Sequence, residues 1–371
     1  GSCPRAQRPA TPAPEPAPRS PRPVRLPSAR LVAQPAPMFR GFANVWTIVG
    51  TTRDLRPDAP LPLQVAGERL VLLRDADGRA RALVDRCPHR GVQLSLGKVK
   101  DGCIECPFHG WRFAGDGRNC HVPWNPDAKL ERLGATPVPV RERGGLLWLY
   151  TAPGLAAPTE PDVPEVLERP GVVTTATALT WKVHWTRAME NMLDWPHLPF
   201  VHAGTIGRDL KKVRAGARMD IAWEDRPWGA HTTSTIDGQP QQGALDFRAP
   251  NAMHLHIPTG KRTLGLMSAC VPIDDTSTRM LLITARDFLR ARLFDRFFHW
   301  ANHRVAIEDQ AVVESSFPSE VPPAGEERSV RTDEPTLKFR KFYRDVLQHS
   351  DAPLSELRPV ASLVRAADKT G

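Results

Sequence analysis

Two cysteine–histidine pairs constrain the fold of this 371-residue chain more than any other feature. The segment "CPHRGVQLSLGKVKDGCIECPFHGW" places Cys87 with His89 and Cys106 with His109. Two thiolates and two imidazoles, each pair on a short loop, form a four-ligand set for a metal centre. The chain must therefore fold so that both loops reach one point. The ligand types alone leave zinc and an iron–sulfur cluster both open.

The order of the ligands favours the cluster. Structural zinc sites usually repeat Cys-x-x-Cys or end in His-x(3–5)-His, whereas each pair here contributes one cysteine and one histidine. A [2Fe–2S] centre with two thiolates on one iron and two imidazoles on the other needs that division. The flanking prolines, with His-Arg-Gly and His-Gly-Trp after the histidines, make the segment resemble the Rieske signature. That resemblance implies that Cys87, His89, Cys106 and His109 bind a [2Fe–2S] cluster.

The remaining cysteines do not indicate a disulfide framework, which favours a reducing, cytoplasmic location. Gly91 and Phe108 stand where respiratory Rieske proteins carry two further cysteines, so the cluster resembles the low-potential type. Cys103 and Cys120 are interpreted as small buried residues. No apolar run reaches the length of a membrane span, so we expect no membrane partner.

The net charge of +9 is concentrated near the N-terminus. Residues 1–37 hold six arginines, one glutamate and eleven prolines, which leaves 44 basic against 40 acidic residues in the rest. Such a segment predicts a disordered, polyproline-like tail, with an organellar transit peptide as the alternative. The balanced charge of the remainder excludes nucleic acid as an expected partner.

Two domains are expected after the tail. Short apolar runs with hairpin turns such as "DADG" predict an all-β domain over residues 38–155. Residues 156–371 mix strands and helices, and we expect this second domain to have its own core. The predicted strands lie near 172–185, 217–236, 252–258 and 263–286, and the predicted helices near 186–194 and 288–315.

A second metal motif lies in "RAMENMLDWPHLPFVHAG", where Asp194, His197 and His202 follow the pattern Asp-x-x-His-x(4)-His. Two imidazoles from one short segment, completed by a carboxylate from elsewhere, form the 2-His-1-carboxylate face of non-haem Fe(II) oxygenases. Pro196 and Pro199 predict that this segment is not one regular helix.

Together, the two motifs make residues 42–345 resemble the catalytic α subunits of Rieske non-haem iron oxygenases, in their compact, dicamba monooxygenase-like type. This resemblance implies an α+β protein, in which an all-β Rieske domain precedes a helix-grip (START-like) catalytic domain. It implies that His197 and His202 bind Fe(II), and that Asp194 links this iron to the Rieske histidine of a neighbouring subunit. Glu190 and Asn191 match the Glu-Asn before this acid, with helix-surface or capping roles as the alternative.

The third iron ligand is predicted from "RVAIEDQAVVESS", which resembles the family segment that supplies the carboxylate. Asp309 is the expected ligand, and Glu308 is the alternative. In "NAMHLHIP", His254 and His256 share one face of a strand and are candidates for the substrate pocket, with a structural role as the alternative.

The predicted function is a homotrimeric Rieske oxygenase that uses O2 and electrons from a separate NAD(P)H-dependent reductase or ferredoxin. Its expected reaction hydroxylates or oxidatively demethylates a small or medium aromatic or cyclic substrate. Cis-dihydroxylation is the alternative reaction. A Rieske electron-transfer protein with an inactive second domain is the alternative from another class.

Overall fold

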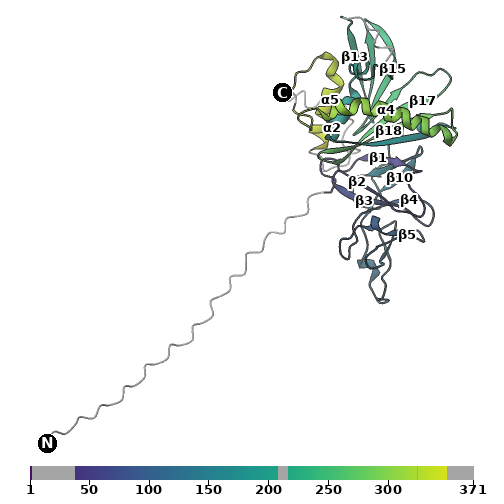
Figure 1. Ribbon diagram of the computed structural model, residues 1–371, viewed down its shortest axis with the longest axis vertical. Helices are drawn as coiled ribbons and strands as arrows, with labels where there is room; N and C mark the ends of the chain where they lie inside the picture. Colours follow the sequence, from purple (N-terminus) through teal and green to yellow (C-terminus); the bar gives the residue numbers. More distant parts are fainter. Residues whose placement is uncertain (2–37, 208–215, 324, 349–371) are drawn as a thin grey trace. The chain divides into compact units, whose positions relative to one another are not determined.

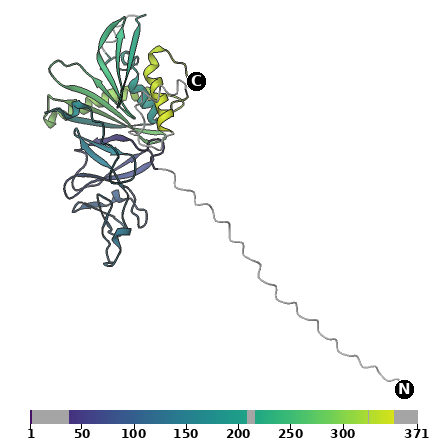
Figure 2. The ribbon, with the colours of Figure 1, turned by 180° about the vertical axis from the view of Figure 1, so that it is seen from behind.

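The computed structural model describes residues 1, 38–207, 216–323 and 325–348. The disorder predicted for residues 1–37 therefore concerns residues that lie almost wholly outside the described ones. The described residues from 38 onward belong to one compact unit, drawn in Figures 1 and 2.

The first domain is all-β, as predicted, and is built from three small antiparallel sheets. One sheet has the order β1 (Trp46–Thr51), β11 (Leu146–Tyr150), β10 (Val140–Arg143). The second has the order β2 (Leu61–Val65), β3 (Glu68–Arg74), β4 (Ala80–Val84), β9 (Pro137–Val138). The third has the order β5 (Lys98–Lys100), β6 (Cys103–Glu105), β7 (Arg112–Ala114), β8 (Asn119–His121). The short 3-10 turns η1 (Leu94–Leu96) and η2 (Leu130–Arg132) connect them.

The second domain contains one seven-stranded antiparallel sheet. Its order is β12 (Val173–Trp181), β18 (Ser277–Arg286), β17 (Leu264–Asp274), β16 (Ala252–His256), β15 (Gln239–Arg248), β14 (Gly229–Ile236), β13 (Met219–Arg226). The first strand in sequence, β12, pairs with the last, β18, along its whole length.

Helices cover this sheet. The long helix α4 (Asp295–Glu314) packs against β12 and β18, and α2 (Trp185–Leu193) packs against β17 and α5 (Glu334–Phe342) (Figures 1 and 2). The shorter elements are α1 (Glu165–Glu168), α3 (Leu198–Val201), η4 (Arg292–Phe294), η5 (Arg331–Asp333) and the π-helical turn η6 (Tyr343–Leu347).

The predicted helix over 288–315 begins later than expected, at Asp295. Leu289 has a φ of +48°, a left-handed conformation that a right-handed helix cannot include. A 3-10 turn then leads into the helix. The helical conformation is interrupted around Pro196, between α2 and α3, as the prolines predicted.

The expectation of independent domain cores is wrong. One continuous core joins residues of the first domain, such as Ile48 and Leu147, to residues of the second, such as Trp185 and Met267. A buried hydrogen bond crosses the same boundary: Asn251 Nδ2 of the second domain donates to Thr47 Oγ1 of the first at 2.9 Å. Hydrophobic patterning shows that a strand face is buried but not what buries it.

A separate, small core lies under the cysteine–histidine loops. Its members are Val71, Leu73, Leu83, Cys87, Leu94, Ile104, Cys106 and Phe113. We call the region around this core, residues 85–124, the cluster tip.

Candidate metal centres

The two cysteine–histidine loops of the cluster tip repeat one backbone arrangement. The Cys87 N–H donates to the Val92 carbonyl at 2.8 Å, and the Gly91 N–H donates back to the Cys87 carbonyl at 2.8 Å. In the second loop, Cys106, Trp111 and Gly110 make the same two bonds, at 2.8 and 3.0 Å.

Both loop glycines have left-handed φ values, +73° and +69°, which glycine adopts without a steric cost. The sequence pattern Cys-x-x-x-Gly thus encodes the loop shape as well as the ligands.

The side chains of these loops are arranged as a Rieske cluster requires, with two cysteines for one iron and two histidines for the other. The His89 and His109 rings are neighbours, with centroids 4.6 Å apart. The two thiols are buried, and burial together with the neighbouring Cys106 thiol raises the pKa of Cys87 to about 11. His89 Nδ1 is buried and has no hydrogen-bond partner among the described residues. A nitrogen left without a partner in this way fits a metal ligand, so the donor set fits a [2Fe–2S] cluster.

Further side chains fix the tip. Trp111 stacks on His89 with ring planes 3° apart. The buried carboxylate of Asp85 accepts hydrogen bonds from the Ser95 N–H at 2.7 Å, from Ser95 Oγ at 2.6 Å and from Gln93 Nε2 at 3.4 Å. Asp85 was not singled out from the sequence, although its place two residues before Cys87 was visible.

The second centre combines two histidines from one turn with a carboxylate from a distant helix. His197 and His202 stand at the N-cap and C-cap of α3, and Asp309 projects from α4. Asp309 Oδ1 lies 3.7 Å from His197 Nε2 and 3.2 Å from His202 Nε2. One ligand atom from each residue lies within 4.8 Å of the other two. The structure thus brings together the three residues expected to bind Fe(II).

Each histidine of this centre has its other ring nitrogen occupied. His197 Nδ1 lies 2.6 Å from the backbone carbonyl of Asp194, and His202 Nδ1 lies 2.9 Å from Glu308 Oε2. Thr205 Oγ1 donates to the same Glu308 oxygen at 2.7 Å. Partners at Nδ1 select the tautomer that leaves Nε2 for a metal. Glu308, the alternative ligand in the sequence analysis, therefore contacts the far side of the His202 ring. It does not belong to the group formed by His197, His202 and Asp309.

The donor set fits a metal ion. Asp309 Oδ1 is buried and accepts no hydrogen bond from the described residues. Burial lowers the pKa of His202, but the nearby carboxylates of Asp309 and Glu308 outweigh it and raise the pKa. A buried carboxylate with one unused oxygen, facing two Nε2 atoms, matches the 2-His-1-carboxylate chemistry.

A largely apolar cavity adjoins this centre. Its lining includes Met192, Leu198, Ile206, Leu245, Met253, Leu255, Leu266, Leu282 and Val305, besides the three ligands. Two residues of this lining carry a buried polar atom with no hydrogen-bond partner among the described residues, Nε1 in Trp181 and Oγ in Ser268. Sequence reasoning missed both, because a strand tryptophan and a strand serine carry no motif.

His254 and His256 do share a strand face, but it is the face turned away from this cavity. Met253 and Leu255 of β16 line the cavity, so the alternating residues lie on the other side. There, Asp246 accepts a hydrogen bond from His256 Nε2 at 2.9 Å, and the two histidines line a second pocket. The prediction that His254 and His256 line the pocket of the iron centre is therefore wrong.

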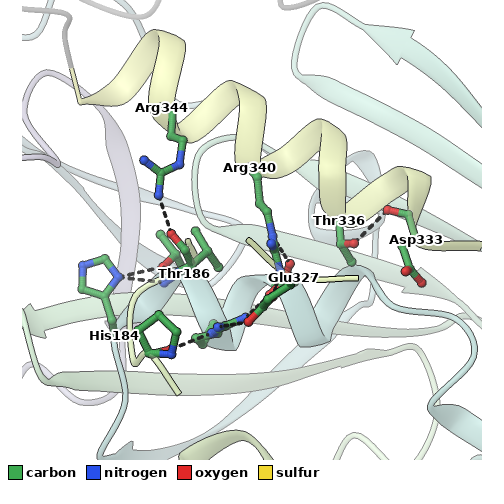
Figure 3. Close-up of polar contacts among 11 residues, drawn as sticks. His184, Thr186, Glu327, Asp333, Thr336, Arg340 and Arg344 are labelled. Atoms are coloured by element: carbon green, nitrogen blue, oxygen red, sulfur yellow. Dashed lines mark hydrogen bonds and ion pairs between the residues drawn. The ribbon is translucent and has the colours of Figure 1, made fainter. Parts of the chain in front are cut away.

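Glu190 and Asn191 do not reach the cavity either. Glu190 pairs with Arg187 at 3.0 Å and with Arg340 of α5 at 2.5 Å. Glu327 completes this network, and Figure 3 shows its contact with Arg340, at 2.6 Å. Hydrogen bonds from Arg187 and Arg340 lower the pKa of Glu327 to about 2 despite its partial burial. The network joins α2 to α5.

Asp194 occupies the border between the cavity and the surface. It is the C-cap of α2 and lines both the cavity and an outer pocket that it shares with Glu190 and Asn191. Its carboxylate Oδ2 lies 3.6 Å from His197 Nδ1, so the hydrogen bond to that ring uses the backbone oxygen instead.

Comparisons with known proteins match the two domains that carry these centres. The Rieske [2Fe-2S] domain family matches residues 45–135, and the vanillate O-demethylase oxygenase C-terminal domain family matches residues 181–348. Chlorophyllide a oxygenase, chloroplastic, of Chlamydomonas reinhardtii is 30% identical over 74% of this chain and 43% of that protein. Methylxanthine N3-demethylase NdmB of Pseudomonas putida is 27% identical over 77% of this chain and 83% of that protein.

Among solved structures, dicamba monooxygenase bound to dicamba has a TM-score of 0.68 at 21% identity, covering 84% of this chain and 98% of that one. This similarity confirms the α+β fold. The chain belongs to the Rieske non-haem iron oxygenases. A [2Fe–2S] cluster and a mononuclear iron are the cofactors of that family. The chain spans about half the length of the chlorophyllide a oxygenases that it matches.

Within the described part of the chain, no helix is both long and apolar enough to cross a membrane.

Proposed function

We propose that this protein is an oxygenase that uses O2 and externally supplied electrons to hydroxylate or demethylate a small or medium aromatic or cyclic substrate. The carrying observation is the convergence of His197 Nε2, His202 Nε2 and Asp309 Oδ1 beside an apolar cavity. Iron held by these side chains would supply O2 activation, and a cluster held by Cys87, His89, Cys106 and His109 would supply electrons singly.

The protein's own contribution is to orient ligands and to exclude water. Glu308 and the Asp194 carbonyl hold the two imidazoles in one tautomer and one orientation. The apolar cavity wall favours a ring-shaped, weakly polar substrate and keeps bulk water away from the reacting atoms.

The two polar atoms of the cavity narrow the substrate class. Trp181 Nε1–H can only donate a hydrogen bond, and Ser268 Oγ–H can donate one. Buried donors without partners are costly, so a substrate that accepts from one or both gains specificity. We therefore propose a cyclic substrate that carries an oxygen or ring-nitrogen acceptor. Ser268→Ala should raise KM for such a substrate, relative to an analogue without the acceptor, more than it lowers kcat.

Monooxygenation is the preferred reaction, because the similar methylxanthine and dicamba enzymes are named as a demethylase and a monooxygenase. Cis-dihydroxylation remains the alternative. Turnover under labelled O2 distinguishes them, because a product with two labelled oxygens would establish the alternative.

The exposed edge of the cluster tip supports a head-to-tail homotrimer. His109 is exposed, and the nearby Phe108 and Trp124 expose 59% and 98% of their surfaces. Exposed aromatic residues around a redox centre suit coverage by another chain. We propose that His109 of the partner subunit faces the Asp194 carboxylate across this contact. Asp194 would then connect His109 to His197, whose Nδ1 lies 3.6 Å from that carboxylate and 2.6 Å from the Asp194 carbonyl.

The variant Asp194→Asn tests this connection. Both metal centres should stay occupied, while reoxidation of the reduced cluster by substrate and O2 nearly stops in stopped-flow measurements. Rapid reoxidation with normal product formation would show that Asp194 does not carry the connection.

The function itself is tested by iron content and substrate-dependent turnover. An active oxygenase should hold about three irons per chain, two in the cluster and one at the second centre. It should consume NADH and O2 with a surrogate reductase only when a suitable substrate is present. A chain with about two irons and no turnover would instead be an electron carrier. The electron donor and the cytoplasmic location stay predictions, since the named chlorophyllide a oxygenases are chloroplast proteins.

A further inference from the structure

The cluster tip contains a second pair of cysteines, away from the ligand set. Cys103 begins β6 and Cys120 lies in the middle of β8, and their Sγ atoms are 3.3 Å apart. The expectation that both are small buried residues is wrong: Cys103 is half-buried and Cys120 is exposed. The two strands are not neighbours, because β7 lies between them in the sheet.

A β-bulge accounts for this unusual meeting. Arg112 of β7 pairs with His121 and Phe113 pairs with Asn119, which leaves Cys120 as the extra residue of β8. Bulges of this kind re-aim the side chain of the extra residue. Here the bulge directs Cys120 toward Cys103, across the intervening strand.

The geometry leaves little movement before a covalent bond. A disulfide has sulfur atoms about 2.05 Å apart, so the two thiols must approach by roughly 1.3 Å, through movement of their side chains and of the bulged strand β8. Burial and the neighbouring Cys120 thiol raise the pKa of Cys103 to about 11, while the charges of Arg112 and Arg118 act in the opposite direction. The exposed Cys120 is therefore the thiol that a soluble oxidant meets first.

We propose that Cys103 and Cys120 form a peroxide-sensitive dithiol at the base of the cluster loop. The Cys120 thiolate attacks hydrogen peroxide, breaks its O–O bond and becomes a sulfenic acid, releasing hydroxide that takes up a proton to give water. The Cys103 thiol then attacks this sulfur, the S–O bond breaks and a second water leaves. Two thiols and one peroxide thus become one disulfide and two waters.

The bond would act directly on the second ligand loop. Cys103 lies three residues before Cys106, and β6 leads straight into the loop that carries Cys106 and His109. A bridge between β6 and β8 would fasten together the two strands on either side of β7, the strand that follows this loop. The oxidised form should therefore release its cluster more slowly than the reduced form does.

Peptide mapping of the holoprotein tests the proposal. Reduced protein is treated with equimolar hydrogen peroxide, free thiols are blocked, and the digest is analysed without reductant while cluster absorbance is followed. We expect a Cys103–Cys120 peptide pair lighter by two hydrogens, restored by dithiothreitol, with the cluster intact. Cys270, which is fully buried, should stay reduced and serves as the internal control.

Two variants separate the steps. In Cys103→Ser, a sulfenic acid at Cys120 should persist and react with dimedone, whereas in Cys120→Ser, Cys103 should stay reduced at the same peroxide dose. A Cys103–Cys120 disulfide that appears only after the cluster has bleached would overturn the proposal. So would the absence of this disulfide in wild-type protein whose cluster is intact. Equal rates of cluster loss to a chelator in the oxidised and reduced wild type would overturn the effect on the loop.

Discussion

The cluster tip and the mononuclear centre achieve metal binding in opposite ways. The tip takes its four ligands from two loops within 23 residues of sequence and rests on a core of eight side chains. The mononuclear centre takes Asp309 from a helix about a hundred residues beyond His202, and the continuous core surrounds it. Local spacing can therefore define the first centre, whereas only the complete fold assembles the second. The tip should depend on its metal for stability, and the second centre on its packing.

The sharpest way to break this comparison is to remove one mononuclear ligand. His202→Ala or Asp309→Ala should lose mononuclear iron and reduce turnover by more than the roughly 10–100-fold typical of outer-shell losses. The visible and EPR spectra of the cluster should stay unchanged. His303→Ala, an exposed position on the same helix, is the control. An Asp309→Ala variant that kept iron and activity would move the carboxylate role to Glu308.

A change in the tip should give the converse result. Asp85→Ala removes an acceptor of three hydrogen bonds next to the first cluster loop. Hydrogen bonds to a charged group contribute about 1.5–3 kcal/mol each, so the tip should lose its cluster on mild heating. Mononuclear iron should be retained at the same temperature. Asp116→Ala, an exposed acid of the same tip, should behave as wild type. Joint loss of both metals would show that the tip and the large core unfold together.

The partner of His202 offers a smaller and graded effect. Glu308→Ala leaves His202 Nδ1 without its acceptor, and such losses weaken metal affinity by roughly 10–100-fold. Glu308→Gln keeps an oxygen in place and should recover part of the affinity. Iron titration monitored against the unchanged cluster signal measures both. Equal affinity in Glu308→Ala and wild type would contradict the orienting role.

The smallest effect concerns the far face of the catalytic sheet. Burial, followed by the charge of His256, lowers the pKa of His254 to about 3, against about 6.5 in an unfolded chain. Between these values the unfolded chain binds a proton that the folded chain does not. The free energy of unfolding should therefore fall as pH drops below about 6.5, by about 1.4 kcal/mol per unit.

The variant His254→Asn should lose this part of the acid sensitivity while keeping its turnover at neutral pH. Urea unfolding at pH 7.5 and pH 5.5 measures the difference, with His303→Asn as the control. A turnover defect at neutral pH would instead return His254 to the substrate site.

Much of the molecule could be predicted because its signals are local. The loops around Cys87 and Cys106 encode ligands and glycine turns within a few residues, and the prolines around His197 encode the break between two helices. The choice between Glu308 and Asp309 depended on how α4 faces α3, which no local pattern contains.

The errors of the sequence analysis concern features that depend on the assembled fold. The alternation in β16 placed His254 and His256 together but could not show which face is internal. The exposure of Cys120 followed from a bulge set by its neighbouring strand. Trp181 and Ser268 gained significance only when the fold enclosed them in one cavity.

The pairing of β12 with β18 has a consequence for synthesis on the ribosome. β12 is made first in its sheet, yet among the described strands it pairs with the last one alone, about a hundred residues later. At roughly 5–20 residues per second, this strand waits about 5–20 s for its partner. During that interval the apolar side chains around Trp181, and the two histidines of α3, are not yet covered by the later strands of the sheet. Holdase chaperones that shield emerging apolar strands should therefore engage nascent chains that end between residues 181 and 277, and release them once β18 has emerged.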